Sequence, residues 1–175
     1  DLCFNNGCTL RYNDPRRFGF WLWTDEDLSK HPRLAHLGPE PLSQDFNAKH
    51  LLTCCQKRRV AIKGVIMEQK VVVGVGNIYA SEALFLSNIS PLMPANKLTL
   101  DDCKLICKNT KKVLKQSIKQ GGTTLRDFSQ SDGKPGYFAQ QLAVYGQENC
   151  QACGSAIEQV RIAGRNSFYC PSCQS

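Results

Sequence analysis

The sequence has 175 residues, 42% of them hydrophobic, so it is long enough to bury a core in one domain or in two small ones. No run approaches the roughly 20 apolar residues that span a bilayer, and no signal-peptide pattern is present, so we expect a soluble cytoplasmic protein without a membrane partner. Lysine and arginine number 22 against 15 acidic residues, a formal net charge of +7. This excess fits a polyanionic partner, although a solvated basic surface has the same composition.

The first predicted element is a β-hairpin from Leu2 to Tyr12, because Asn5-Asn6-Gly7 supplies residues that tolerate the positive φ of a tight turn. A third strand is expected from Phe18 to Trp23. The loop before it carries Arg16 and Arg17. Guanidinium groups clamp phosphates, and a projecting ring such as that of Phe18 can wedge between base pairs. The alternative is structural, with Phe18 opening a core strand beside two solvated arginines.

Residues 30–42 are rich in Pro and Gly, and they are predicted to be a linker with a domain boundary near residue 42. Ser43 is expected to cap a helix that runs to about Arg58. A short helix from about Val60 to Glu68 should follow. The apolar face of the first helix is expected to contain Phe46, His50, Leu51 and Cys54 or Cys55.

A long helix is predicted from Asp101 to Gln120, ended by Gly121-Gly122 as a C-cap. Lysines occupy one side of this helix. The other side is expected to carry its apolar residues, Leu105, Val113, Leu114 and Ile118.

Between these helices an apolar run leads into a turn with two glycines, Gly74 and Gly76, and Asn77 then opens another helix. Such a turn leaves unpaired N–H groups at the positive end of the helix dipole, where an anion can approach closely, and Asn77 can add a side-chain donor. Tyr79 stands where a dinucleotide fingerprint needs its third glycine. The segment therefore favours a backbone phosphate over a nucleotide cofactor, with a purely structural turn as the alternative.

Residues 129–136 combine Ser, Asp, Gly, Lys and Pro without periodicity, which is typical of a flexible loop. Aromatic residues flank it at Phe128, Tyr137 and Phe138. A loop of this kind could fold over a base turned out of a duplex. It could equally be a solvated surface connection.

Four of the ten cysteines have the spacing of a structural zinc site. Cys150 and Cys153 form one C-x2-C pair, and Cys170 and Cys173 form the second. Gly154 supports the first knuckle because a tight knuckle needs a residue that tolerates positive φ. We expect one structural Zn²⁺, with a pair of disulfides as the alternative. The other six are interpreted as small buried thiols, namely Cys3, Cys8, Cys54, Cys55, Cys103 and Cys107.

Taken together, these motifs resemble the bacterial formamidopyrimidine-DNA glycosylase family over nearly the whole chain. The resemblance is carried by RYNDPRRFGFWLW, HLGPEPL, VVVGVGNIYASEALF, QGGTTLRDFSQSDGKPGYFAQQLAVYG and the cysteine pattern. It implies a fold that is mainly α with some β. Residues 1–41 would be the later strands of a catalytic β-sandwich and a linker, 42–141 a helix-two-turns-helix DNA-binding domain with a lesion-capping loop, and 142–175 a β-hairpin zinc finger.

The resemblance also implies roles for individual residues. Asn77 and the glycine turn would hold a phosphate beside the lesion, and Lys63 and Arg59 would contact the same strand. Arg165, at the finger's hairpin turn, would bind phosphates and donate a proton in δ-elimination. Arg17 would take a backbone phosphate, and Arg16 and Phe18 would fill the gap left by the everted base. The loop over the damaged base would include Ser131, Lys134, Gly136 and Tyr137.

The activity implied by the family is that of a bifunctional glycosylase and AP lyase. It excises oxidised purines, 8-oxoguanine and formamidopyrimidines, from double-stranded DNA and then cleaves by β,δ-elimination, acting as a monomer. Family members begin with Pro-Glu, which supplies the nucleophile, and this sequence contains neither residue at its start, so we expect these residues to bind DNA without turnover. Two alternatives stay open: an endonuclease-eight-like enzyme for oxidised pyrimidines, which the long SDGKPGYF loop argues against, and a non-catalytic zinc-ribbon DNA-binding module.

Overall fold

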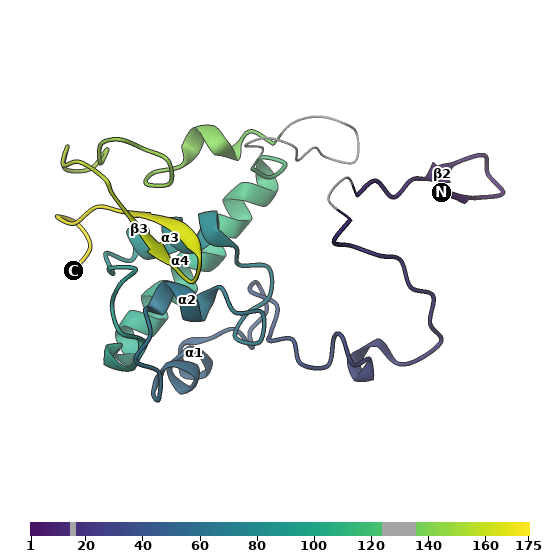
Figure 1. Ribbon diagram of the computed structural model, residues 1–175, viewed down its shortest axis with the longest axis horizontal. Helices are drawn as coiled ribbons and strands as arrows, with labels where there is room; N and C mark the ends of the chain where they lie inside the picture. The colour runs from purple at the N-terminus through teal and green to yellow at the C-terminus, as the bar shows by residue number, and fades with distance from the viewer. Residues whose placement is uncertain (15–16, 124–135) are drawn as a thin grey trace. The chain divides into compact units, whose positions relative to one another are not determined.

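The computed structural model describes residues 1–14, 17–123 and 136–175 and divides the chain into two compact units, Asp1–Ala35 and His36–Ser175 (Figure 1). The predictions for Arg16, Phe128, Ser131 and Lys134 concern positions outside the described residues. No helix among the described residues is long and apolar enough to cross a membrane.

The smaller unit begins with the expected hairpin. Strands β1 (Leu2–Cys3) and β2 (Thr9–Leu10) pair antiparallel, with Leu2 opposite Leu10 and Cys3 opposite Thr9. Gly7 takes a φ of 82° in the turn, so the positive-φ residue lies where the sequence indicated. A short 3-10 helix, η1 (Leu28–Lys30), follows, and the side chain of Asp27 caps it.

The third strand predicted from Phe18 to Trp23 is wrong for this structure, because the described residues 17–23 form no strand. A strand needs backbone hydrogen bonds from a neighbour, and the only strand pair described in residues 1–35 is β1 with β2. Phe18 and Trp23 are 85% and 91% exposed, so neither is a core residue in this structure. Cys3 and Cys8 are also exposed, which corrects their interpretation as buried thiols: this short hairpin has no covered face.

Helix α1 (Ala48–Cys55) starts later than predicted. Asn47 is its N-cap, and its side-chain oxygen accepts a hydrogen bond from the backbone N–H of His50 at 3.1 Å. Ser43, predicted to be the cap, lies in the preceding turn and accepts from the backbone N–H of Asp45. Both Asn and Ser are good N-cap residues, but the hydroxyl of Ser43 is already hydrogen-bonded within the preceding turn. The apolar face is confirmed, since Phe46, Leu51 and Cys55 have no exposed surface.

The remaining predicted helices are present in the predicted order: α2 (Ile62–Ile66), α3 (Asn77–Leu86) and α4 (Leu100–Lys119). The 3-10 helix η2 (Ala95–Lys97), which was not predicted, precedes α4. Thr99 and Asp102 form a reciprocal capping box at the start of α4, and Gly121 and Gly122, both with positive φ, follow its end.

The buried face of α4 differs from the predicted one. Leu105 and Ile118 are 43% and 65% exposed, whereas Val113 and Leu114 are buried as expected. The buried positions also include polar and thiol side chains that a hydrophobicity pattern does not reveal. They are Cys103, Cys107, Asn109, Thr110 and Ser117, and Ile106 is buried with them.

Helix α4 packs against α1 and α3 to enclose the main core, and the C-terminal hairpin lies beside α3 (Figure 1). Strands β3 (Glu158–Ile162) and β4 (Arg165–Tyr169) pair from Glu158–Tyr169 to Ile162–Arg165, and Ala163 and Gly164 supply the two positive-φ residues of the turn. A second apolar cluster joins Phe85 of α3 to Val144, Cys150 and Cys170. The finger and the helices therefore share a packed interface within His36–Ser175.

Candidate nucleic-acid interface and metal centre

The four cysteines of the two knuckles meet at one point. Their sulfur atoms all lie within 4.8 Å of one another; Cys153 and Cys170 are 3.5 Å apart, and Cys150 and Cys173 are 3.9 Å apart. Four thiolates about 2.3 Å from a tetrahedral zinc ion would be spaced by about 3.8 Å. The residues therefore fit one structural Zn²⁺, and the alternative of two disulfides fits less well because all four thiols are free.

Local structure favours metal-binding knuckles. Gly154 has a φ of 76°, and its N–H donates to the carbonyl oxygen of Cys150, which closes the first knuckle. Hydrogen bonds from Ser155 lower the pKa of Cys153 to about 6, whereas the hydrogen bond with Cys153 raises the pKa of Cys173 to about 12, so without a metal Cys153 is the thiolate of this pair. Four cysteine ligands leave no open coordination position, so a zinc ion here stabilises the fold and takes no part in chemistry.

The finger is fastened to the end of α3 by Gln174. The side-chain oxygen of Gln174 accepts from the N–H of Cys170 at 2.9 Å, and its side-chain nitrogen donates to the carbonyl oxygen of Ile89 at 2.8 Å. Ser175 and Asn88 add a backbone hydrogen bond between the same two segments. The metal knuckle is thus connected directly to the loop after α3.

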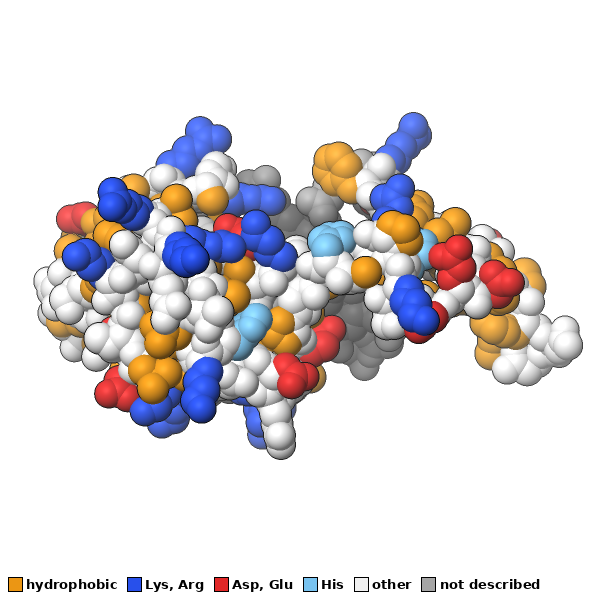
Figure 2. Space-filling view, turned by 90° about the horizontal axis from the view of Figure 1, so that it is seen from below, with side chains coloured by type: hydrophobic (Ala, Val, Ile, Leu, Met, Phe, Trp, Pro, Cys, Tyr) orange, Lys and Arg blue, Asp and Glu red, His pale blue; other side chains and the backbone are white. Residues whose placement is uncertain are grey.

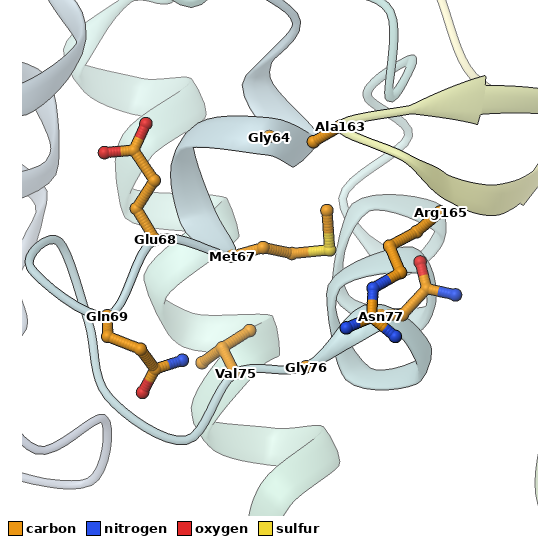
Figure 3. Close-up of a pocket in the computed structure, with 9 residues that line it drawn as sticks. All are labelled: Gly64, Met67, Glu68, Gln69, Val75, Gly76, Asn77, Ala163 and Arg165. Carbon is orange, nitrogen blue, oxygen red and sulfur yellow. The ribbon is translucent and has the colours of Figure 1, made fainter. Parts of the chain in front are cut away.

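A cleft of about 390 Å³ lies where the hairpin turn meets the start of α3 (Figure 3). Asn77 and Arg165 both line it, and Figure 3 shows their side chains next to each other on the same side of the cleft. Gly76 precedes the helix with an extended backbone, so the first N–H groups of α3 lie at this wall. The complete lining is Gly64, Met67, Glu68, Gln69, Val75, Gly76, Asn77, Ala163 and Arg165.

This wall can attract an anion. The α3 N-terminus carries the positive end of the helix dipole, and the exposed guanidinium of Arg165 offers a bidentate donor. Glu68 lies on the opposite wall (Figure 3). Partial burial alone would raise the pKa of Glu68, but Arg58 at 2.8 Å and Lys70 at 3.2 Å outweigh it and hold that pKa below its ordinary value. The two cations offset the carboxylate's charge.

The side-chain amide of Asn77 is fully engaged within the protein. Its nitrogen donates to the main-chain oxygen of Asn166 at 2.9 Å and to the hydroxyl of Tyr145 at 3.2 Å. Its oxygen accepts from the ammonium of Lys63 at 2.6 Å. Asn77 therefore joins α2, α3 and the β4 strand of the finger, and a phosphate in the cleft would meet Arg165 and the helix N–H groups first.

Lys63 is completely buried, and its ammonium donates to the hydroxyl of Ser167 at 2.7 Å as well as to Asn77. Burial lowers the pKa of Lys63 to about 8. In this conformation the ammonium lies beneath the hairpin, so a direct contact with a DNA strand, as the family resemblance implied, requires the hairpin to move. Any effect of Lys63 on a ligand in the cleft is otherwise indirect.

Other candidate residues lie elsewhere. Arg59 lines a separate surface hollow with Pro94, Asn96 and Lys97. Arg17 and Phe18 belong to the smaller unit, where Arg17 has a φ of 56°. In the larger unit, Lys and Arg side chains are spread across the visible face and do not gather in one patch (Figure 2). Charge alone therefore does not single out the cleft.

The segment from Gly136 onward is only partly available to a ligand. Tyr137 is 51% exposed, but Phe138 is 3% exposed and packs with Val113 and Leu142, so it cannot stack on a base as the sequence suggested. A side chain on Gly136 would meet the backbone of Gly122, with its Cβ only 2.2 Å from that carbonyl oxygen. Gly136 is therefore needed for a close backbone approach.

The structural role of Glu82 was not identified from the sequence. Glu82 is 3% exposed, and its carboxylate accepts hydrogen bonds from the N–H groups of Ala143, Val144 and Tyr145 at 2.8, 3.0 and 2.9 Å. It holds the segment that leads into the finger against α3. The sequence carries a signal for it, because Glu82 is the only charged residue in the largely apolar helix NIYASEALFL.

Comparison with known proteins agrees with this arrangement. Residues 37–129 match the family model described as the formamidopyrimidine-DNA glycosylase H2TH domain, and residues 147–175 match the zinc finger found in FPG and IleRS. The chain belongs to the formamidopyrimidine-DNA glycosylase family. This confirms the resemblance and the fold of helices with a C-terminal hairpin finger.

Individual relatives show how far the similarity extends. The chain is 57% identical over 176 residues to formamidopyrimidine-DNA glycosylase of Escherichia coli O6:H1, which covers 99% of this chain and 65% of that protein. The MutM (Fpg) protein of Thermus thermophilus matches with a TM-score of 0.82 and 40% identity, over 92% of this chain and 62% of that one. Lactococcus lactis Fpg in complex with DNA containing an abasic site matches with a TM-score of 0.73 and 36% identity, over 79% and 52%. The matched part of the chain therefore spans from about half to about two thirds of the length of these relatives.

Proposed function

We propose that this chain is the DNA-binding part of a base-excision repair glycosylase. The observation that carries the proposal is the common cleft, in which Asn77 at the start of α3 and Arg165 of the zinc-finger hairpin meet. Two elements far apart in sequence converge there on one site that offers two positive groups, the N-terminus of α3 and the guanidinium of Arg165. A helix N-terminus with a guanidinium beside it is suited to a phosphate of a DNA backbone.

The individual roles are assigned on this basis. Arg165 binds phosphates around the lesion and donates the proton in δ-elimination. Asn77 begins the helix α3, whose N–H groups hold the phosphate beside it, and Arg59 contacts the same strand from outside the cleft. Arg17 binds a backbone phosphate, and Arg16 and Phe18 fill the gap left by the everted base.

The loop that caps the damaged base comprises Ser131, Lys134, Gly136 and Tyr137. Residues 1–41 belong to the catalytic β-sandwich domain and its linker, residues 42–141 form the helix-two-turns-helix domain that binds DNA and the lesion, and residues 142–175 form the zinc finger. Damaged double-stranded DNA is the partner, and the protein acts as a monomer in the bacterial cytoplasm.

For a protein of the relatives' full length, the proposed activity is excision of oxidised purines followed by strand cleavage. An amine displaces the base and forms an imine with the sugar, and β- and δ-elimination then open the strand. The purine preference is supported by the names of the relatives and by a Lactococcus lactis homologue that was crystallised with a Fapy-dG-containing DNA.

The test is binding of the 175-residue chain to a duplex with an abasic-site analogue and to the matched undamaged duplex, at fixed salt. We expect preference for the damaged duplex. Arg165→Ala should weaken binding by about 10- to 100-fold, the value of a charge-assisted contact of about 1.5–3 kcal/mol. Arg161→Ala is the matched control, because Arg161 is an exposed arginine on the same hairpin outside the cleft.

Other outcomes separate the alternatives. Equal affinity for both duplexes would favour a non-catalytic zinc-ribbon module. Excision of thymine glycol in preference to 8-oxoguanine by the full-length protein would favour the endonuclease-eight-like enzyme. If Arg165→Ala and Arg161→Ala lost equal affinity for the damaged duplex, the cleft would not be the DNA-binding site.

A further inference from the structure

Lys63 has an unusual environment for a lysine. It is 0% exposed, and its ammonium has two neutral oxygen acceptors, the side chains of Asn77 and Ser167. No carboxylate lies within ion-pair distance of it among the described residues. A buried cation without a counter-ion is costly, so a structural role alone would be filled as well by an apolar side chain.

The two acceptors belong to different parts of the fold. Asn77 begins α3 and forms the cleft wall, whereas Ser167 lies on β4, two residues after Arg165. The ammonium thus ties the helix N-terminus to the strand that carries the cleft's guanidinium. Gly64, the residue after Lys63, lies at the hairpin turn, since a Cβ built on it would be 3.8 Å from the side chain of Ala163.

We propose that Lys63 is a positioning residue for the phosphate site: it acts from behind the cleft through Asn77 and Ser167, and a phosphate bound in front of it is its counter-ion. The inference rests on the proposed function, because it needs a phosphate in the cleft. Lys63 holds Asn77 and Arg165 in one geometry, and its charge adds to the field at the helix N-terminus. It does not touch the DNA.

This role predicts a pH dependence. The ammonium is charged below its pKa of about 8 and loses its proton as the pH rises above it. A bound phosphate favours the charged form, so binding takes up a proton above pH 8, and affinity should fall by up to about tenfold per pH unit there. The folded state, in contrast, disfavours the charge relative to the unfolded chain. The contribution of Lys63 to stability therefore rises between pH 8 and 10.5, while affinity falls.

Other titratable groups lie on the elements around Lys63, and their contributions have to be subtracted. Glu82 is occupied by three backbone N–H groups, and Tyr145 bonds to Asn77. The titratable or charged side chains of the surrounding elements are Lys49, His50, Cys54 and Cys55 on α1, Tyr79 and Glu82 on α3, Tyr145 before the finger, and Arg165 and Tyr169 on β4.

The experiment measures affinity for an abasic-analogue duplex from pH 6.5 to 9.5, using the 175-residue chain, Lys63→Met, Ser167→Ala and Lys108→Met. Met removes the charge at similar volume, and Lys108 is an exposed lysine on α4 that serves as the matched control. We expect Lys63→Met to bind about 10- to 100-fold more weakly at pH 7 and to lack the decline above pH 8. Ser167→Ala should weaken binding less and keep the decline, and Lys108→Met should behave like the unsubstituted chain.

An NMR titration of the Lys63 ammonium gives a second measurement that does not depend on a variant that folds. Its pKa should lie near 8 in the free chain and rise when the duplex is bound. Affinity that is flat from pH 7 to 9, together with an unchanged Lys63 pKa in the complex, overturns the inference while DNA binding itself stands. Absence of binding by the unsubstituted chain at pH 7 instead overturns the proposed function.

Discussion

The side-chain nitrogen of Asn77 donates to the main-chain oxygen of Asn166, 89 residues later, at 2.9 Å. This bond joins the first residue of α3 to the residue after Arg165 on β4. The side-chain nitrogen of Asn77 also donates to the hydroxyl of Tyr145, and the side-chain oxygen accepts from the ammonium of Lys63. Asn77 therefore orients the finger, and its side chain reaches a phosphate only by giving up one of these two acceptors.

Asn77→Asp separates these roles at nearly constant volume. The carboxylate still accepts from Lys63 but cannot donate to the oxygen of Asn166, and it repels a phosphate in the cleft. We expect affinity for an abasic-analogue duplex to fall at least about tenfold, with a small change in melting temperature because an ion pair with Lys63 replaces the lost bond. Fluorescence anisotropy at fixed salt measures the change. Asn5→Asp, an exposed position in the turn of the N-terminal hairpin, applies the same charge change outside the cleft, and an equal loss there would contradict the assignment.

Glu82→Gln tests the clamp beneath the finger. A glutamine has one acceptor oxygen, and its NH₂ group would face backbone N–H donors that the carboxylate now satisfies. We expect a loss of about 2–4 kcal/mol in the free energy of unfolding, measured by urea denaturation followed by circular dichroism. Glu148→Gln, an exposed position in the segment that enters the finger, is the matched control and should be nearly neutral. Similar midpoints for the two variants would show that the clamp contributes little.

Removal of the metal should unfold the finger. Zinc supplies on the order of 10 kcal/mol of folding free energy in such fingers, and the hairpin cannot hold Arg165 at the cleft without it. We expect Cys170→Ser to lose bound zinc and to abolish the gel shift with damaged DNA. Cys8→Ser, an exposed cysteine of the N-terminal hairpin, should keep both. Full affinity in Cys170→Ser would mean that the finger is dispensable for binding.

Periodicity and spacing predict the parts of this fold that depend on local sequence. The order of the helices, the C-cap at Gly121-Gly122, the hairpin turn at Gly7 and the zinc site at the four spaced cysteines were all predicted, because each depends on residues close together in sequence. The strand from Phe18 to Trp23 was not, because a strand exists only when a neighbouring backbone pairs with it.

The interior of the site escaped prediction for the same physical reason. The positions of Lys63 and Ser167 became meaningful only when folding brought α2 under β4, a contact across 104 positions of sequence. The face of α4 was misjudged because Thr110 and Ser117 are buried by packing, whereas Ile118 is 65% exposed. An apolar pattern identifies residues that favour burial, but it does not identify the polar residues that neighbouring elements cover.

The cysteines outside the finger give a last test, because three of them are buried and two are exposed, with Cys54 half-buried between these extremes. Burial raises the pKa values of Cys55, Cys103 and Cys107 to about 12, 11 and 12, so at pH 7.5 these thiols are protonated and shielded. Cys3 and Cys8 are exposed, and we expect iodoacetamide to label both in the native zinc-bound chain while the three buried thiols stay unmodified. Peptide mass spectrometry identifies the labelled sites, and chelation of zinc should add the four finger cysteines. Labelling of Cys103 or Cys107 at the rate of Cys3 would mean that α4 opens readily from α1, which would contradict the packed core described above.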